Sequence, residues 1–389
     1  MKVLLVSSRF PLPPWRGNQL RTVQWLDALA DHRCVLLCPV PDGPDAGGRI
    51  AAEVRALPPV GAAGLGRAAA AAARGRPAQE GLYDSSRARR VVADAVRDWR
   101  PDVAVIQMVR CGWAADVVSS IDPTVPLVFD AIDCMAMHYG RAAATAPGPL
   151  RPVYRLEADR CRRRETELVR RAALTAAVST RDLDALGAGP DGRVVPVAGA
   201  VGSTAQRHAT GEPVVLLSGN LGYRPTVRAA IRFADRVWPQ VRRRVPNARW
   251  LLVGARPAAA VRLLASRPGI DVHGDVDDLA SYLGCARLAI APMSTGSGVP
   301  LKIVEALAAG VPVVADPWAA AGLEDPSAVV AADGDQAWLE AVVSLLDDDE
   351  SVRRQRERGL AAWRMHYHPE RVRDRVREAV ETAAGSLER

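Results

Sequence analysis

Two side chains near the start of one apolar helix carry the clearest chemistry in this sequence. The chain holds 51 Lys and Arg residues, of which only Lys2 and Lys302 are lysines. Lys302 lies in the segment GSGVPLKIVEALAAGVPVVAD (296–316), at the expected first turn of a helix. Free N–H groups in a first helical turn bind anions, whereas a lysine there opposes the helix dipole unless an anion is near. The position therefore favours a phosphate site.

Glu305 follows Lys302 by three residues, on nearly the same side of that helix. The paired oxygens of a carboxylate can accept two hydrogen bonds from a sugar diol, and a nucleotide would supply both a diol and a diphosphate. The alternative is an ordinary ion pair between residues i and i+3 at a domain surface. The sequence by itself leaves both interpretations open.

Length and composition indicate two domains. The chain has 389 residues, of which 49% are hydrophobic. This length is more than a single hydrophobic core usually organises. The opening apolar run ends at Ser7, too early for a signal peptide, and no run reaches the roughly 20 apolar residues of a membrane span. We therefore expect a soluble, cytoplasmic protein. The six cysteines are scattered without disulfide or zinc spacing, so we expect buried thiols and no metal.

Apolar strands alternate with amphipathic helices along both halves of the chain, which predicts two doubly wound parallel α/β domains. Ligands bind in such domains where strand carboxyl ends meet helix amino ends. The turn-rich segment 198–213 is the expected linker. The expected strands are 2–7, 34–38, 103–106, 126–130 and 174–179 in the first half, and 214–219, 249–254, 270–274, 287–292 and 328–332 in the second. Helices are expected near 86–99 and 225–243, among others.

A strongly basic helix is predicted for residues 151–171, with eight arginines and four acidic residues. It is either a solvated face crossed by ion pairs or a surface for an anionic membrane or substrate. Nucleic acid is not expected as a partner, because no aromatic residues interleave with the basic run.

The second half resembles the donor-binding domain of GT-B glycosyltransferases of family 4, also called glycosyltransferase group 1. The resemblance rests on APMSTGSGVPLKIVEALAAGVPVVAD, LVGARP and VHGDVDDLASYL, while SRFPLPPWRGNQLRTVQWLDALA and FDAIDCMAMHYGR resemble the first domain of the same group. The similarity is closest to bacterial sugar transferases associated with exopolysaccharide and exosortase systems. It implies two facing Rossmann-like domains with an interdomain cleft: 1–205 for the acceptor, 206–366 for the donor, and a helix at 367–389 that crosses back.

The resemblance also implies roles for individual residues. Glu305 would bind the nucleotide ribose, and Lys302 with the amides of Gly298 and Val299 would hold the diphosphate. Gly17, after the first strand, would come close to the donor phosphate. Two departures stand out. Ser297 occupies the place of a first glutamate. Asn220 and Pro225 stand near the places of an arginine and a lysine, for which Arg224 and Lys302 are the expected substitutes. The full predicted donor set is Gly17, Asn220, Arg224, Val276, Ser294, Gly296, Ser297, Gly298, Val299, Lys302 and Glu305.

A second group of residues follows a strand end in the first half. Asp130 and Asp133 come at the end of the strand near 126–130 and can contact or deprotonate an acceptor hydroxyl, although aspartates there also cap turns. Asp133 joins Lys302 and Glu305 as a predicted catalytic residue. The predicted acceptor set is Trp15, Arg16, Asp130, Asp133, His138 and Tyr139.

The resulting hypothesis is a retaining, metal-independent transfer of sugar from a nucleotide diphosphate sugar to a hydroxyl on a glycan, a lipid-linked glycan or a natural product. Lys302 would stabilise the charge that grows on the departing diphosphate. No cofactor is expected, and the DVD at 275–277 is read as a turn with Asp277 as a helix cap. The alternatives are a GT-B nucleotide-sugar epimerase and an inactive scaffold; a dehydrogenase is disfavoured, because no GxGxxG follows the first strand.

Overall fold

The chain folds into two compact units, each of which is described by itself. The computed structural model describes residues 1–14, 16–40, 50, 52–199, 212–293 and 298–386. Unit 1 comprises Met1–Val197 together with Glu370–Arg389, and unit 2 comprises Ala198–Pro369. The divisions expected from the sequence lie after residues 205 and 366.

Unit 1 is built on a seven-stranded sheet in which every pairing is parallel. Its central strands are buried and mostly apolar, as expected for a sheet with both faces covered, with Gln107 and Asp130 as buried polar exceptions. In sheet order the strands are β3 (Glu53–Leu57), β2 (Arg33–Pro39), β1 (Lys2–Val6), β4 (Val103–Gln107), β5 (Leu127–Ile132), β6 (Leu174–Ala177) and β7 (Gly192–Val194).

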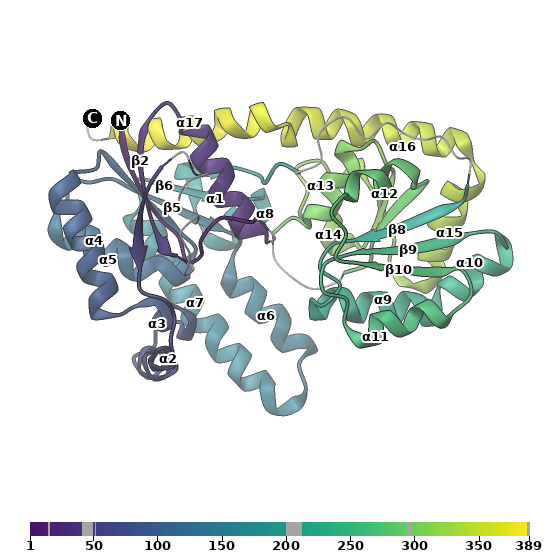
Figure 1. Cartoon of the computed structure of the whole chain (residues 1–389), viewed down its shortest axis with the longest axis horizontal. Helices are drawn as coiled ribbons and strands as arrows, with labels where there is room; N and C mark the ends of the chain where they lie inside the picture. The colour runs from purple at the N-terminus through teal and green to yellow at the C-terminus, as the bar shows by residue number, and fades with distance from the viewer. Residues whose placement is uncertain (15, 41–49, 51, 200–211, 294–297, 387–389) are drawn as a thin grey trace. The chain divides into compact units, whose positions relative to one another are not determined.

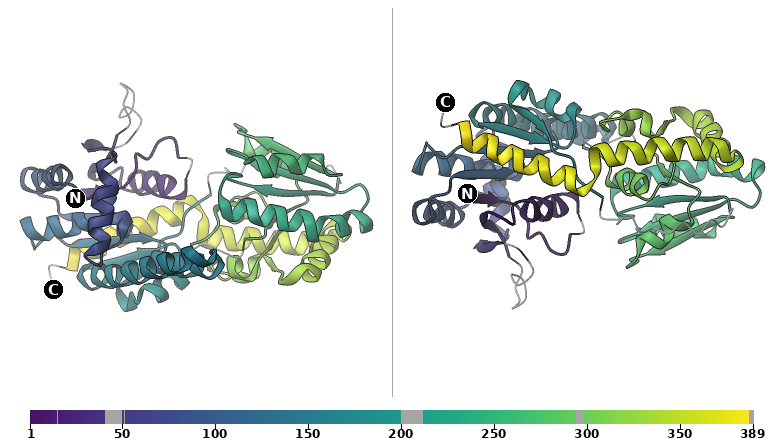
Figure 2. Two further views of the ribbon diagram at one scale, coloured as in Figure 1. Left: turned by 90° about the horizontal axis from the view of Figure 1, so that it is seen from below. Right: turned by 90° about the horizontal axis from the view of Figure 1, so that it is seen from above.

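Helices cover this sheet (Figure 1), and the last helix of the chain belongs to them. Helix α17 (Pro369–Gly385) adds Val376 and Val380 to the core that contains Trp25, and Arg377 Nε donates to the carbonyl oxygen of Ala28 at 2.7 Å. The others are α1 (Gly17–Ala28), α2 (Ala63–Ala73), α3 (Ala78–Tyr83), α4 (Ser86–Trp99), α5 (Gly112–Ile121), α6 (Met135–Thr145), α7 (Arg151–Arg171) and α8 (Thr180–Leu186). Helices α6 and α7 lie side by side as a hairpin (Figures 1 and 2).

Unit 2 repeats the plan with a six-stranded sheet, again parallel throughout. Its strands are β10 (Ile270–Gly274), β9 (Arg249–Gly254), β8 (Val214–Ser218), β11 (Leu288–Ala291), β12 (Val313–Ala315) and β13 (Val330–Ala331). Its helices are α9 (Arg224–Arg236), α10 (Trp238–Arg244), α11 (Ala259–Arg262), α12 (Leu279–Cys285), α13 (Leu301–Ala308), α14 (Pro317–Ala320), α15 (Gly334–Asp347) and α16 (Asp349–Ala362), and a π-helical turn (Trp363–Tyr367) follows α16.

Alternating side chains of β8 build a separate core on each face of this sheet. Leu216 packs in the cluster that contains Ile303 and Leu307 of α13, whereas Leu217 packs in the cluster of Phe233 and Trp250. The rings of Phe233 and Trp250 meet edge to face at 4.8 Å. Helix α13 is thus held by one core face of the sheet.

Strand order places a switch point in each unit. In unit 1 the order reverses between β1 and β4, and in unit 2 between β8 and β11. Chain connections leave such a point in opposite directions, so that a crevice opens beyond the carboxyl ends of the two strands. Ligand-binding residues are therefore expected after β8 and β11 in unit 2 and after β1 and β4 in unit 1.

Some elements differ from expectation for identifiable reasons. Strands β3, β7 and β12 were not predicted: β3 and β7 carry no clear apolar pattern, and β12 is an apolar run of only three residues. The helix expected near 225–243 is divided at Val237 into α9 and α10, because Pro239 starts a new helix more readily than it continues one. Among the described residues, no helix is long and apolar enough to span a membrane.

Candidate active site

Helix α13 carries Lys302 to the switch point of unit 2. The helix starts after Pro300, which adopts an extended conformation as its N-cap, and residues Ile303–Ala308 are buried. Lys302 Nζ lies 3.4 Å from the sulfur of Met293, which follows β11. The sequence predicted this helix start, although Pro300 stands one position earlier than expected.

Two glycines shape the other side of the ammonium group. A Cβ on Gly219, which follows β8, would lie 3.4 Å from Cε and 3.5 Å from Nζ of Lys302. Gly219 has φ +115° and Gly254 at the end of β9 has φ +145°, and a Cβ on Gly254 would overlap the carbonyl oxygen of Gly219. The backbone at both positions requires glycine, and this leaves the lysine lying directly against the main chain at the end of β8.

Glu305 sits one turn further along α13 and is nine-tenths buried, with 9% exposure. A Cβ on Gly199 would lie 3.3 Å from its Cα, so this segment covers the backbone of Glu305 closely. Within the described part of the chain, neither Lys302 nor Glu305 forms an ion pair within 4.0 Å. The interpretation as a simple i,i+3 ion pair is therefore not supported, and the carboxylate keeps its capacity to accept hydrogen bonds.

Burial shifts the titration of both groups towards neutrality. It lowers the pKa of Lys302 to about 8, an effect that the charge of Glu305 partly opposes. It raises the pKa of Glu305 to about 7, which the charge of Lys302 partly opposes. Buried groups with shifted pKa values in a ligand-binding crevice are typical of functional sites.

The other predicted donor residues are only partly brought to this place. Gly298, with φ +70°, is buried just before α13, and Val299 beside it is half-buried. Asn220 follows Gly219 directly, and its Oδ1 accepts from the amide of Gly222 at 3.0 Å, so its side chain shapes the turn. Arg224 is exposed at the first residue of α9. Ser294, Gly296 and Ser297 lie outside the described residues.

The DVD segment forms a turn beside this crevice. Asp275 Oδ1 accepts from the amide of Arg256 at 2.8 Å, which ties the ends of β9 and β10 together, while Val276 packs partly buried on the core beneath α13. Asp278 rather than Asp277 caps α12, and it accepts from the amide of Ala280 at 2.8 Å. In the described ranges no group of three or more His, Cys, Asp or Glu side chains is arranged to hold a metal ion.

Asp130 requires a correction. It is fully buried in unit 1, where its Oδ1 accepts from Arg21 Nη2 at 2.6 Å and its Oδ2 from Arg21 Nε at 3.1 Å. Gln107 Nε2 also donates to Oδ2 at 3.1 Å. With both oxygens engaged by buried donors, Asp130 cannot receive an acceptor as predicted, and it holds α1 to β5 instead.

The residues that surround Asp130 were missed by sequence reasoning. Arg21 and Thr22 are fully buried on α1, and Thr22 Oγ1 donates to Gln107 Oε1 at 2.7 Å. Arg21 also stacks over the ring of Trp25 at 5.5 Å and donates to the carbonyl oxygens of Val195 and Pro196. An arginine one turn before a core tryptophan was the available signal, because arginine rarely takes a core position without a partner.

Asp133, His138 and Tyr139 do come from one region, the start of α6. Asp133 is half-buried just after β5. The amides of Met135 and Ala136 donate to Glu165 of α7 at 2.7 and 3.1 Å, and that of Cys134 donates to Asp182 at 2.9 Å. Two carboxylates from other helices therefore fix the backbone that follows Asp133.

These neighbours change the chemistry available at α6. Burial raises the pKa of Glu165 to about 7, and the charge of Asp133 contributes to the rise. Burial also raises the pKa of Tyr139 to about 12, and its ring stacks on Tyr154 at 6.2 Å. Tyr139 is therefore a neutral hydroxyl near pH 7 and not a base. Of the predicted acceptor residues near α6, this leaves Asp133 as the carboxylate.

The first predicted acceptor residues lie at the start of α1. Arg16 is exposed and extended as the N-cap of α1, and Gly17 is exposed with nothing within 4 Å of the place of a Cβ. Trp15 lies outside the described residues. One turn later, Arg21 links this helix to Asp130, so the buried network sets the position of Gly17.

Helix α7 is less solvated than its composition suggests. Arg164 is 2% exposed, and its guanidinium pairs with Glu80 at 3.0 Å and with Asp116 at 2.9 Å. Arg171 pairs with the other oxygen of Asp116 at 2.6 Å. Part of the basic run is therefore an internal ion-pair network that joins α3, α5 and α7.

Comparison with known proteins agrees with this architecture. Residues 212–348 match the model of the family described as Glycosyl transferases group 1. No curated protein matches the chain in sequence.

Three solved structures illustrate the likeness over nearly the whole chain. Sucrose-phosphate synthase from Thermosynechococcus elongatus has TM-score 0.73 and 15% identity, covering 97% of this chain and 98% of its own. Anabaena HepE in complex with UDP and glucose has TM-score 0.66 and 15% identity, covering 98% and 99%. A trehalose-phosphate synthase from Burkholderia xenovorans, in complex with glucose-6-phosphate, has TM-score 0.65 and 12% identity, covering 98% and 99%.

At these identities the solved structures establish the fold, and the family match covers the unit that presents Lys302 and Glu305. Residues 212–348 of the second unit match the glycosyl transferases group 1 family, and the chain as a whole has the GT-B fold.

Proposed function

We propose that the protein is a retaining, metal-independent transferase that moves a sugar from a nucleotide diphosphate sugar to a hydroxyl acceptor. The single observation that carries the proposal is the position of Lys302, whose ammonium lies at the switch point of unit 2 beside Met293 and Gly219, with the unpaired Glu305 one turn away. A diphosphate and a ribose diol are the partners that these two charges lack.

In this proposal Lys302 and the amides at the start of α13 stabilise the charge that develops on the diphosphate as its bond to the anomeric carbon breaks. Glu305 accepts hydrogen bonds from both ribose hydroxyls and so fixes the donor. Asp133 on unit 1 orients the acceptor hydroxyl or takes its proton. Each role uses a group that burial or a fixed backbone has positioned beforehand.

The nucleotide can be tested first. HepE structures hold UDP and UDP-glucose, which makes uridine diphosphate the first candidate, with ADP and GDP for comparison. We expect one nucleoside diphosphate to raise the melting temperature at constant ionic strength, equally with magnesium and with EDTA. An inactive scaffold would show no shift for any nucleotide. An epimerase would convert the nucleotide sugar without an acceptor.

Variants then test the roles. Lys302→Ala and Glu305→Ala should each abolish most of the transfer and the nucleotide shift. Lys2→Ala is the matched control, because Lys2 is the other lysine and lies in unit 1, where its ammonium reaches the carbonyl oxygen of Trp99. Full transfer in either site variant would contradict its assigned role.

For the acceptor we propose a lipid-linked glycan on an anionic membrane, as in the bacterial exopolysaccharide transferases that the sequence resembles. The specific support is the tip of the α6–α7 hairpin, where Leu150, Val153 and Leu156 are 43%, 59% and 51% exposed. Residues 135–156 contain three arginines and no Asp or Glu. Exposed apolar side chains among arginines suit the interface of an anionic bilayer.

Vesicle sedimentation tests this contact. The chain should bind phosphatidylglycerol vesicles and not phosphatidylcholine vesicles, and Leu150→Ser with Val153→Ser and Leu156→Ser should remove the binding. Leu65→Ser is the control, since Leu65 on α2 is 73% exposed and lies away from the hairpin tip in sequence. Absence of vesicle binding would instead favour a soluble natural product as the acceptor.

A further inference from the structure

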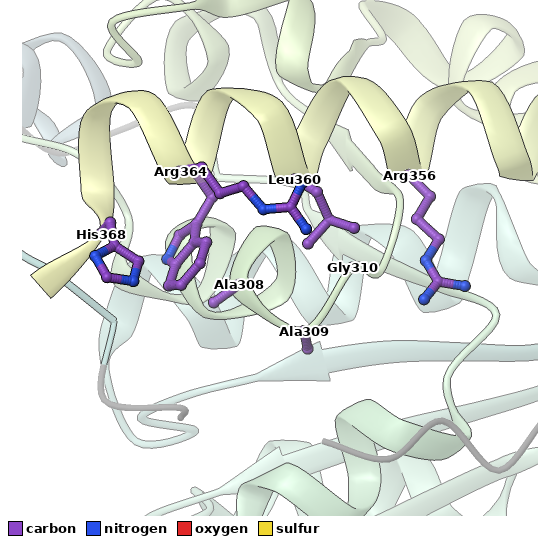
Figure 3. Close-up of a pocket in the computed structure, with 8 residues that line it drawn as sticks. Ala308, Ala309, Gly310, Arg356, Leu360, Arg364 and His368 are labelled. Carbon is purple, nitrogen blue, oxygen red and sulfur yellow. The ribbon is translucent and has the colours of Figure 1, made fainter. Parts of the chain in front are cut away.

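A cavity of about 430 Å³ lies at the carboxyl end of α13, the end opposite to Lys302 and entirely within unit 2. Figure 3 shows it between the last residues of α13 on one side and α16 with the turn that follows it on the other. Its volume falls within the range of small-molecule sites. At about 1.5 Å per residue, the eight residues of α13 separate this cavity from the start of the helix by roughly 12 Å.

Two arginines and a histidine line the cavity, and no carboxylate is among the described residues that line it. Arg356 of α16, Arg364 of the π-helical turn and His368 are placed along one wall (Figure 3). Within the described chain, Arg356 and Arg364 have no hydrogen bond or ion pair, whereas Arg353 on the same helix pairs with Glu350. Two guanidinium groups with unused donors provide the planar forks that bind phosphate oxygens.

The favourable interaction of arginine with a helix carboxyl end is the simpler explanation for these charges. It does not account for the open volume of the cavity. Gly310 ends α13 in the left-handed conformation that is common at helix ends, and a Cβ there would come within 3.1 Å of Arg356 Nε. Glycine at this position, with φ +65°, leaves the guanidinium beside bare backbone. The cavity therefore combines open volume with two guanidinium groups that have no ion-pair partner among the described residues.

Another part of the lining is apolar and rigid. Trp363 is 5% exposed, and its ring meets that of His368 edge to face at 5.0 Å. Its indole N–H is buried without an acceptor in the described residues. The indole nitrogen is itself covered, so Trp363 and Leu360 together offer the cavity an apolar surface for a compact ring.

We propose that this cavity binds a small phosphate monoester, with its phosphate on Arg356 and Arg364 and its ring on Trp363 and Leu360. The site is separate from the proposed nucleotide site, since the two occupy opposite ends of α13. It does not depend on the proposed transfer reaction.

Calorimetric titration of the full chain with ribose 5-phosphate tests the proposal, with ribose as the uncharged comparison at constant ionic strength. We expect saturable binding of the ester and none of ribose. Arg356→Gln with Arg364→Gln should weaken the binding at least about tenfold, as the loss of two charge-assisted contacts requires. Arg353→Gln on the same helix and Lys302→Ala at the other end of α13 should leave it unchanged.

Two results would overturn the assignment: no saturable binding, or binding that Lys302→Ala removes and the double arginine variant retains. The exposed Arg364→Gln alone provides a second test, since it should weaken binding without altering the melting temperature even where the double variant folds poorly. Nucleotide binding measured on the same variants keeps this result distinct from a failure of the transferase proposal.

Discussion

The ammonium nitrogen of Lys302 lies 3.4 Å from the thioether sulfur of Met293. A thioether is a weak acceptor and carries no charge, so it satisfies little of an ammonium group with three donors. The lysine thus occupies a half-buried position at the switch point of the sheet without an anionic partner within 4.0 Å among the described residues. A bound diphosphate would supply that partner. Because binding would then depend on the positive charge of Lys302, its protonation state is the variable to test.

The affinity for a nucleotide diphosphate sugar should pass through a maximum between about pH 7 and pH 8. Above pH 8 Lys302 loses its proton and with it the attraction for the diphosphate, since its pKa in the empty site is about 8. Below pH 7 Glu305 gains a proton and accepts fewer hydrogen bonds from the ribose, since its pKa is about 7. Calorimetric dissociation constants between pH 5.5 and 9 measure both limbs.

Lys302→Arg is the control for the alkaline limb. A guanidinium stays protonated throughout this range, so the variant should keep its affinity above pH 8 while retaining the acid limb. If the affinity of the unmodified protein does not change across pH 8, Lys302 does not bind the diphosphate.

Glu305→Gln should stabilise the protein at pH 8 while it removes transfer. The folded-state pKa of Glu305 is raised above its ordinary value, so its ionisation opposes folding increasingly as the pH rises from about 4.5 through 7. We expect a gain of up to about 1 kcal/mol at pH 8, because the lost attraction to Lys302 offsets part of the benefit, and none at pH 4. Thermal unfolding at both pH values measures it, with Glu357→Gln on exposed α16 as control. A large loss of stability at pH 8 would show instead that the carboxylate is structural.

Much of the fold could be predicted, because its elements carry continuous apolar runs or clear caps. IDVHG at 270–274 coincides with β10, and the predicted helix at 86–99 coincides with α4, where Ser85 accepts from the amide of Ala88. Strand β3 was missed because its sequence EVRAL is polar at the edge of the sheet and only Leu57 is fully buried.

The two candidate sites also differed in how far they could be predicted from the sequence. Lys302 and Glu305 share one helix, so their spacing was visible in the sequence. The bond between Arg21 and Asp130 joins residues 109 positions apart, and no local pattern reports it. Asp130 was therefore assigned to an acceptor when its partner was a buried arginine. A single sequence shows which polar residues follow a strand, but only the packed fold shows which of them are already satisfied.

Asp130 and Asp133 should respond differently to the same change. Asp130→Asn leaves Arg21 buried without its charged partner, which costs about 3 to 5 kcal/mol when such a pair is broken. Asp133→Asn alters a half-buried group after β5, so it should leave unfolding nearly unchanged and lower transfer. Urea unfolding and a transfer assay on both variants separate the two roles. Equal destabilisation by both changes would make Asp133 a structural residue as well.

Gly17→Ala tests the approach of the donor phosphate to the start of α1. Nothing lies within 4 Å of the added Cβ, and alanine favours helix by up to about 1 kcal/mol, so stability should be unchanged or slightly higher. If a phosphate packs against the bare backbone, the methyl group occupies its place and transfer should fall at least about tenfold. Gly66→Ala in α2 is the matched control, because that glycine is also exposed with nothing within 4 Å. Transfer is measured at subsaturating donor. If Gly17→Ala leaves transfer undiminished, the phosphate does not bind at this helix, and the buried network of Arg21 has a structural role alone.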